Sequence, residues 1–164
     1  MKIYVIGTGT MAKGIVKAFA AKMPVVMKSR TQASLDKAMG SISKSYAKLV
    51  EKGKIAQDAM DAIMANISTT TDYATFADAD LVIEAAVEEM QLKKDVFMEL
   101  DKICKPETIF ATNSSSLSIT EIAACTSRPT QFIGMHFFNP RRPYGTGRSN
   151  QGSGDFRGRL QANR

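Results

Sequence analysis

Short apolar segments alternate along the chain with longer segments in which apolar residues recur at helical spacing. We predict β-strands over residues 2–6, 25–27, 66–70, 80–86, 108–111 and 132–136. We predict helices directly after Gly7 and over residues 31–52, 55–65, 89–103 and 118–124. Such periodicity is the main sequence signal for secondary structure. Strands that alternate with helices indicate an α/β fold with a doubly wound parallel sheet.

The helices predicted over residues 31–52 and 55–65 follow each other with only a short turn between them. Gly53 is the expected C-terminal cap of the first helix, since glycine readily adopts the left-handed conformation that ends helices. We therefore predict a helical hairpin inserted into the α/β fold. Its basic positions are Lys44, Lys48, Lys52 and Lys54.

A glycine-rich turn follows the first predicted strand and opens the first helix. Residues 7–12 read Gly-Thr-Gly-Thr-Met-Ala, a G-x-G-x-x-A pattern. In dinucleotide-binding folds the first glycine makes the turn, the second lets the backbone approach a pyrophosphate, and the last small residue keeps the helix close to the sheet. In this Rossmann-type domain we expect cofactor contacts from Gly7, Gly9, Thr10, Met11 and Ala12. The alternative is a glycine-rich turn that binds nothing.

The end of the second predicted strand bears on the choice of cofactor. NAD-binding folds carry an acidic residue about 20 positions beyond the glycines, where it binds the ribose hydroxyls. Ser29 stands at that place, between Lys28 and Arg30. A hydroxyl and cations can bind a 2′-phosphate, and no carboxylate repels it. We therefore expect Ser29 and Arg30 to contact the cofactor and NADP(H) to be preferred over NAD(H). The alternative is a set of solvated residues at a strand end.

Three further motifs carry a resemblance to a known family. Residues 80–88 read DLVIEAAVE, residues 111–117 read ATNSSSL, and residues 134–140 read GMHFFNP. Together they resemble the 3-hydroxyacyl-CoA dehydrogenases, and the bacterial 3-hydroxybutyryl-CoA dehydrogenases most of all. The resemblance covers residues 1–140. It implies a Rossmann domain of about this length, followed by a helical domain that dimerises and closes over the substrate.

The resemblance implies a role for several individual positions. Glu88 and Lys93 match residues near the nicotinamide and its ribose. Asn139 matches a neighbouring cofactor contact, and Asn113, in the same loop as Ser115, is expected to support that serine and to contact the cofactor. Ser115 matches the serine that binds the substrate oxygen close to the cofactor.

The resemblance also bears on two residues of the predicted helical hairpin and on Ser114. Ser45 and Lys52 match positions that contact the CoA moiety. A solvated helix face is the equally balanced alternative for these two residues. Ser114 is a mild departure, because the family usually has threonine there.

His136 is the only histidine of the chain and stands at the end of the last predicted strand. The resemblance makes it the catalytic histidine. Ligands of parallel sheets bind beyond the carboxyl ends of the strands. An imidazole titrates near neutrality, so it can take the proton of a 3-hydroxyl group and return it in the reverse reaction. Ser115 can hydrogen-bond the same oxygen and hold it in place. The alternative for His136 is a hydrogen-bonded structural residue.

The composition changes abruptly after Pro140. Residues 141–164 contain six arginines, five glycines and one acidic residue, and they lack valine, isoleucine, methionine and lysine. Such a segment cannot bury enough apolar surface to offset the entropy of ordering it. We therefore predict a dinucleotide-binding domain over residues 1–140 and a disordered, non-native tail over residues 141–164.

A shift of reading frame accounts for this tail. Back-translation of residues 144–151, moved forward by one nucleotide, can spell Met-x-Leu-Val-Glu-Val-Ile-Lys, which matches the segment that follows Asn-Pro in the family. We therefore expect a one-nucleotide insertion near the codons of Pro140 and Arg141, from a sequencing error or a real lesion. In the family, the glutamate of that segment pairs with the catalytic histidine, and Arg148 stands in its place. Without that glutamate and the helical domain, we expect little dehydrogenase activity and no family-type homodimer.

The remaining features of composition exclude other classes of protein. The formal net charge is +6, but residues 1–140 contribute only +1, so nucleic-acid binding would depend on the tail alone. No apolar run is long enough to cross a membrane, and the first 21 residues do not form a signal peptide. Cys104 and Cys125 have no metal-type spacing, so we expect reduced thiols, no metal and a cytoplasmic protein.

Three other functions stay open from the sequence. The first is a non-catalytic NAD(P)-binding module. The second is a related β-hydroxyacid dehydrogenase, although those relatives typically use a lysine base rather than a histidine such as His136. The third is nucleic-acid binding through the arginines of the tail.

Overall fold

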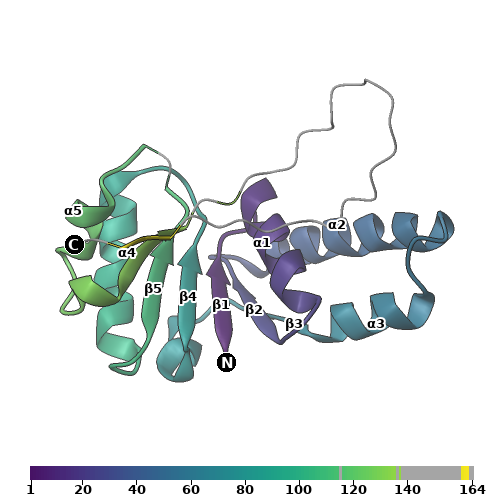
Figure 1. The fold of residues 1–164 in the computed structure, drawn as a ribbon, viewed down its shortest axis with the longest axis horizontal. Coiled ribbons are helices and arrows are strands. Elements are labelled where there is room, and N and C mark those ends of the chain that lie inside the picture. Colours follow the sequence, from purple (N-terminus) through teal and green to yellow (C-terminus); the bar gives the residue numbers. More distant parts are fainter. Residues whose placement is uncertain (115, 136, 138–159, 163–164) are drawn as a thin grey trace.

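The computed structural model describes residues 1–114, 116–135, 137 and 160–162 (Figure 1). Six parallel strands form a sheet in the order β3-β2-β1-β4-β5-β6, and a short antiparallel strand, β7, follows at the edge. The strands are β1 (Ile3–Ile6), β2 (Val25–Lys28), β3 (Ile67–Thr70), β4 (Leu81–Glu84), β5 (Ile109–Thr112), β6 (Phe132–Met135) and β7 (Leu160–Ala162). The strand order reverses between β1 and β4, which is the position where doubly wound folds bind dinucleotides.

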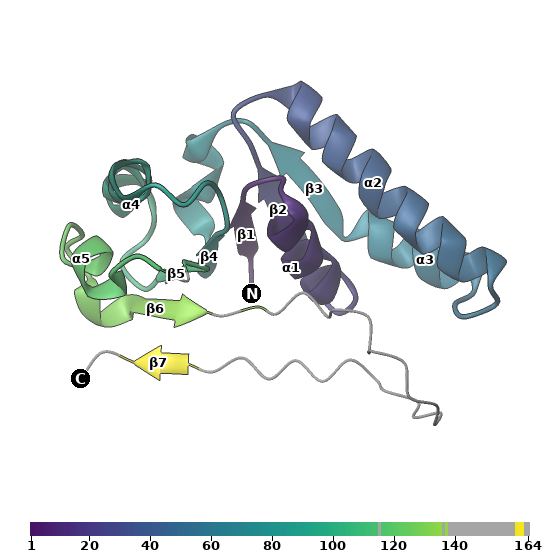
Figure 2. The same cartoon turned by 90° about the horizontal axis from the view of Figure 1, so that it is seen from above.

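Helices cover both faces of the sheet. They are α1 (Thr10–Ala20), α2 (Gln32–Glu51), α3 (Gln57–Ala65), α4 (Met90–Ile103) and α5 (Ile119–Ala123), with 3-10 helices η1 (Tyr73–Asp78) and η2 (Pro129–Gln131). Figure 2 shows α1 and α4 on opposite faces. This arrangement confirms the predicted α/β fold with a doubly wound parallel sheet.

Each face of the sheet has its own core, because successive strand residues point to opposite sides. On one face, Val5 of β1 packs with Ile15 of α1 and Leu35 of α2. On the other face, Phe110 of β5 packs against Phe97 of α4, with ring centroids 5.4 Å apart. Every residue of β1 is buried, as expected for a strand near the centre of a parallel sheet. The two cores hold the carboxyl ends of the strands at one common edge.

The predicted helical hairpin is present as α2 and α3. The hydroxyl of Thr31 accepts a hydrogen bond from the backbone N–H of Ser34 at 3.3 Å and so caps the start of α2. Gly53 has a φ of 64° and ends the hairpin's first helix in the left-handed conformation. The amide of Asn66 donates to the carbonyl oxygen of Ala20 at 2.9 Å, which ties the end of α3 to the end of α1.

Within the segment predicted to be a disordered tail, the structure describes three residues. Leu160–Ala162 form β7 and pair antiparallel with β6, with Gly134 opposite Gln161. An edge strand presents unpaired N–H and C=O groups, and almost any extended segment can pair with them. Composition does not reveal such pairing, since the hydrogen bonds come from the backbone. The helix η1 was also not predicted, and it supplies Tyr73 to the site described next.

Candidate dinucleotide site

A cleft opens at the point where the strand order reverses. It has a volume of about 340 Å³. Its walls come from the ends of β1, β2 and β4 and from one face of α4. The lining residues are Ile6, Gly7, Thr8, Gly9, Lys28, Ser29, Arg30, Tyr73, Glu84, Ala85, Ala86, Val87, Leu92, Lys93 and Val96. The structure therefore brings together five groups of the predicted cofactor site: the two glycines, Ser29, Arg30 and Lys93.

Gly7 makes the turn that closes one end of the cleft. Its φ is 123°, and a Cβ atom placed on it would lie 2.6 Å from the carbonyl oxygen of Ala85. Its N–H donates to the carbonyl oxygen of Lys28 at 2.9 Å. A residue with a side chain would be strained in this backbone conformation and would collide with the loop after β4. Gly7 is thus required by the packing of the fold itself.

Gly9 has a different role, because no residue in the described part of the chain occupies the space beside it. A Cβ atom on Gly9 would meet no atom within 4 Å. Gly9 is also the N-cap residue of α1, whose first turn holds Thr10 and Met11 and contains no acidic residue. Ala12, one turn into the helix, is fully buried against the sheet. The first backbone N–H groups of a helix have no intrahelical partner, and together with the helix dipole they favour an anion such as a pyrophosphate.

The end of β2 places two cations beside Ser29. Lys28 is almost completely buried, and its ammonium nitrogen lies 3.2 Å from the centroid of the Tyr73 ring. Burial lowers the pKa of Lys28, and the charge of Arg30 lowers it further. Ser29 is half-buried and Arg30 is exposed. Burial also raises the pKa of the Tyr73 phenol to about 12, so the ring is neutral at physiological pH.

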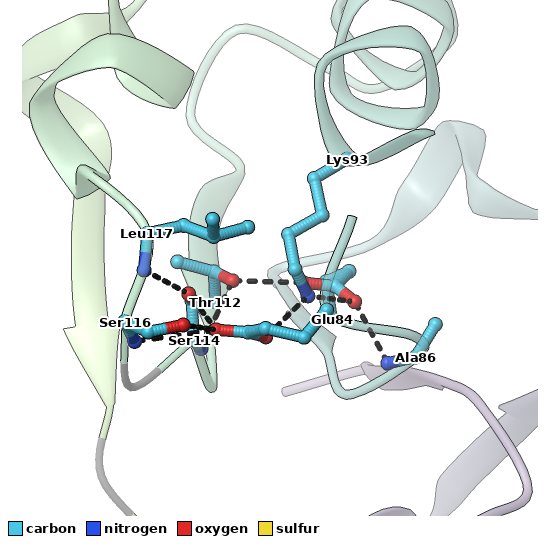
Figure 3. A network of polar contacts seen from close by, with 8 residues as sticks. Glu84, Ala86, Lys93, Thr112, Ser114, Ser116 and Leu117 are labelled. Atoms are coloured by element: carbon cyan, nitrogen blue, oxygen red, sulfur yellow. Dashed lines mark hydrogen bonds and ion pairs between the residues drawn. The ribbon is translucent and has the colours of Figure 1, made fainter. Parts of the chain in front are cut away.

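A buried ion pair forms the inner wall of the cleft. Glu84 and Lys93 are 1% and 2% exposed, and the ammonium of Lys93 lies 2.6 Å and 2.8 Å from the two carboxylate oxygens. The same carboxylate accepts hydrogen bonds from the hydroxyl of Thr112 and the N–H of Ala86, each at 2.7 Å. Figure 3 shows these groups converging on Glu84. The ends of β4 and β5 and the start of α4 are thereby held together.

Glu88 extends this network to the loop after β5. Its carboxylate lies 3.4 Å from the ammonium of Lys93. It accepts hydrogen bonds from the hydroxyl of Ser114 and from both the N–H and the hydroxyl of Ser116, the last two at 3.3 Å and 3.2 Å. The N–H of Leu117 donates to the hydroxyl of Ser114 at 3.1 Å. Glu88 therefore fixes the loop on either side of position 115.

Asn113 connects the ends of β4, β5 and β6. Its N–H donates to the carbonyl oxygen of Glu84 at 2.8 Å, and its side-chain oxygen accepts from the N–H of Phe137 at 3.1 Å. The predicted residues Ser115, His136 and Asn139 lie outside the described residues. Their roles remain predictions.

A shallow groove runs along α2, away from the main cleft. Its lining residues are Lys37, Gly40, Ser41, Lys44, Ser45 and Lys48. The hydroxyl of Ser45 accepts a hydrogen bond from the ammonium of Lys17 on α1 at 3.2 Å. Lys52 is exposed and caps the C-terminal end of α2, beyond the residues that line this groove. The structure thus places Ser45 in a basic groove and Lys52 past its end.

Sequence reasoning missed four polar residues of this site. The sequence analysis gave no role in the site to Glu84, Thr112, Ser114 or Tyr73. A carboxylate inside a buried strand was the available signal, since such a group needs a buried partner. That partner is Lys93, nine positions further along the chain.

Neither cysteine takes part in the site. Cys104 is buried and Cys125 half-buried, and both are free thiols. Burial raises the pKa of Cys104 to about 11, which keeps it in the unreactive thiol form. Within the described residues there is no group of three or more potential metal ligands and no helix long and apolar enough to cross a membrane.

A family model described as 3-hydroxyacyl-CoA dehydrogenase, NAD binding domain, matches residues 2–144. The chain belongs to this family. The glycine turn, the open space beside Gly9 and the cleft at the strand reversal fit what an NAD binding domain requires. The family resemblance noted in the sequence is thereby confirmed.

Curated relatives and solved structures agree with this assignment. The chain is 54% identical over 141 residues to 3-hydroxybutyryl-CoA dehydrogenase of Clostridioides difficile, covering 85% of this chain and 50% of that protein. It is 49% identical to the probable 3-hydroxybutyryl-CoA dehydrogenase of Deinococcus radiodurans, with the same coverage of each chain. The crystal structure of 3-hydroxybutyryl-CoA dehydrogenase from Escherichia coli K12 superposes with a TM-score of 0.83 at 37% identity, covering 85% of this chain and 30% of that one. The NAD binding domain thus spans about half the length of the curated relatives it matches.

Proposed function

We propose that this domain serves an NAD(P)-dependent dehydrogenase that interconverts 3-hydroxyacyl-CoA and 3-oxoacyl-CoA, with 3-hydroxybutyryl-CoA as substrate. The observation that carries the proposal is the cleft at the strand reversal, with Gly9 open to a pyrophosphate at one end and the Glu84–Lys93–Glu88 network at the other. Two proteins named 3-hydroxybutyryl-CoA dehydrogenase or probable 3-hydroxybutyryl-CoA dehydrogenase share this domain at 54% and 49% identity.

Each predicted residue has a part in this proposal. When bound in the cleft, an oxidised nicotinamide would supply the acceptor for the hydride that leaves C3 of the substrate. His136 takes the proton of the 3-hydroxyl group, and Ser115 holds that oxygen by a hydrogen bond. Glu88 and Lys93 orient the nicotinamide ribose, while Asn113 and Asn139 support the nicotinamide end.

The CoA moiety is proposed to lie along α2. Ser45 and Lys52 are its contacts, and the lysines of the groove attract its phosphates over a distance.

NADP(H) is the proposed cofactor rather than NAD(H). Ser29 stands where a carboxylate would bind ribose hydroxyls, and the cations Lys28 and Arg30 line the cleft on either side of it. A 2′-phosphate gains charge-assisted hydrogen bonds in such a setting. Affinities for NADPH and NADH, measured on the same sample, test this preference, and tighter binding of NADH refutes it.

A chimera tests the catalytic proposal. Residues 1–140 are joined to the part of the Clostridioides difficile relative that follows its matched region. We expect the chimera to reduce acetoacetyl-CoA with NADPH, and we expect His136→Gln to abolish turnover while cofactor binding is retained. A chimera that folds and binds cofactor without turnover favours the alternative of a non-catalytic NAD(P)-binding module.

For the 164-residue chain itself we propose cofactor binding with little turnover. Arg148 stands where the family resemblance places the glutamate partner of the catalytic histidine. We further propose that residues 141–164 are read out of frame. The nucleotide sequence after the codon of Pro140 tests this, because one frame should encode Met-x-Leu-Val-Glu-Val-Ile-Lys. An intact gene with no such continuation in any frame refutes it.

A further inference from the structure

Lys28 is a buried cation that faces the cleft without an anionic partner. Its side chain is 3% exposed, and its ammonium makes no hydrogen bond or ion pair with any residue in the described part of the chain. The ammonium of Lys28 lies over the ring of Tyr73, and its nitrogen is 3.2 Å from the ring centroid. A cation on an aromatic face is attracted by the ring quadrupole, but the ring carries no charge to neutralise it.

The contrast with Lys93 shows what is missing at Lys28. Lys93 is equally buried, but it is neutralised by Glu84 and approached by Glu88. Around Lys28 the acidic side chains Glu99 and Asp72 act only through longer-range attraction. Burying a charge without a partner costs free energy, so an anion that enters the cleft beside Lys28 would offset that cost.

The position of Lys28 identifies the anion. The start of α1 at Gly9 is the proposed pyrophosphate site, and the residues after β2 lie at the ribose of the adenosine half in folds of this type. Lys28, Ser29 and Arg30 all line that end of the cleft. The group of a nicotinamide dinucleotide that carries additional negative charge there is the 2′-phosphate of NADP(H).

We propose that Lys28, rather than the exposed Arg30, is the residue that selects NADP(H), by forming an ion pair with the 2′-phosphate. This inference rests on the proposed function of the cleft. Arg30 is exposed to solvent, where an ion pair is screened and contributes little. The ammonium of Lys28 is held in place by Tyr73 in a buried position, where a charge-assisted hydrogen bond is stronger.

The experiment compares Lys28→Met with the matched control Arg30→Met. Lys28→Met keeps the length and apolar contact of the side chain and removes the charge. Dissociation constants are measured on the 164-residue chain by the fluorescence of NADPH and NADH, and by competition with 2′,5′-ADP and 5′-AMP. We expect Lys28→Met to weaken the binding of NADPH and of 2′,5′-ADP by about 10- to 100-fold. In the same variant, the dissociation constants of NADH and 5′-AMP should change by less than about threefold. The control Arg30→Met should weaken NADPH binding by less than about fivefold.

Each outcome decides between distinct explanations. Equal weakening of NADPH and NADH by Lys28→Met would show that Lys28 contacts the adenine or supports the fold, and would overturn the inference. A larger loss of NADPH binding in Arg30→Met would overturn it as well. If Lys28→Met does not fold, Lys28→Gln provides the same comparison with a neutral polar side chain. If the unmodified chain binds neither dinucleotide, the proposed function itself fails.

Discussion

The ammonium nitrogen of Lys93 lies 2.6 Å from a carboxylate oxygen of Glu84, and both side chains are almost completely buried. Removing one partner of such a pair leaves an uncompensated buried charge. We therefore expect Glu84→Gln to lower the free energy of unfolding by about 3 kcal/mol. Urea denaturation followed by circular dichroism measures this change.

The matched control for this pair removes both charges. The double variant Glu84→Gln/Lys93→Met should recover a substantial part of the lost stability, since no isolated charge remains buried. A double variant less stable than Glu84→Gln alone would mean that the two residues are not coupled in this way. The double-mutant cycle, completed with Lys93→Met, measures the interaction energy between Glu84 and Lys93.

Gly7 is expected to be essential for stability because of the backbone and not the cofactor. Gly7→Ala places a Cβ atom 2.6 Å from the carbonyl oxygen of Ala85, at a φ of 123°. We expect a loss of at least about 2 kcal/mol in the free energy of unfolding without any ligand present. Gly40→Ala is the control, because it lies within α2 in open space and should stabilise by up to about 1 kcal/mol. Comparable stabilities for the two variants would contradict the described turn.

Ser29→Asp should reverse the cofactor preference. The new carboxylate repels a 2′-phosphate and can accept hydrogen bonds from the ribose hydroxyls of NAD(H). We expect NADPH binding to weaken by about 10-fold or more, and NADH binding to be retained or improved. Ser29→Asn introduces a similar shape without charge and serves as control. An unchanged ratio of the two dissociation constants in Ser29→Asp would argue against a ribose contact at this position.

Asp80, which directly precedes β4, is expected to make the stability of the protein depend on pH. A hydrogen bond from Lys105 and one from the N–H of Lys2 at 2.6 Å lower the pKa of Asp80 from 3.8 to about 2. A carboxyl group whose pKa is lowered by folding stabilises the protein above its unfolded-state pKa and loses that effect as the pH falls toward 2. Asp80→Asn should therefore be less stable than the unmodified chain at pH 7, and the difference should shrink below about pH 4. A difference that stays constant from pH 7 to pH 2 would contradict this.

The central elements of the fold could be predicted, because the apolar periodicity and the cap residues that define each element lie within its own segment of the sequence. The strand from Ile3 to Ile6 ends at Gly7, and the hairpin from Thr31 to Ala65 carries its own cap residues. Each observed boundary lies within about two residues of the predicted one. The glycine turn was also assigned correctly to the start of α1.

The polar network could not be predicted, since its contacts join residues far apart in the sequence. Thr112 reaches Glu84 from the neighbouring strand, and Ser114 reaches Glu88 from another loop. The pairing of Leu160–Ala162 with β6 uses backbone groups alone, which side-chain patterns do not encode. The burial of Lys28 on Tyr73 depends on η1, an element that the apolar pattern did not reveal.

If the cleft beside Gly9 receives the pyrophosphate of a nicotinamide dinucleotide, a side chain at position 9 should block cofactor binding. NADPH is titrated into the 164-residue chain and into Gly9→Val, whose Cβ would enter the space beside the backbone without touching any atom of the described residues. We expect the unmodified protein to bind NADPH saturably at one site per chain, and we expect Gly9→Val to lose at least about 10-fold in affinity at unchanged stability. Absence of binding to the unmodified chain, or equal affinity in the two proteins, would contradict it.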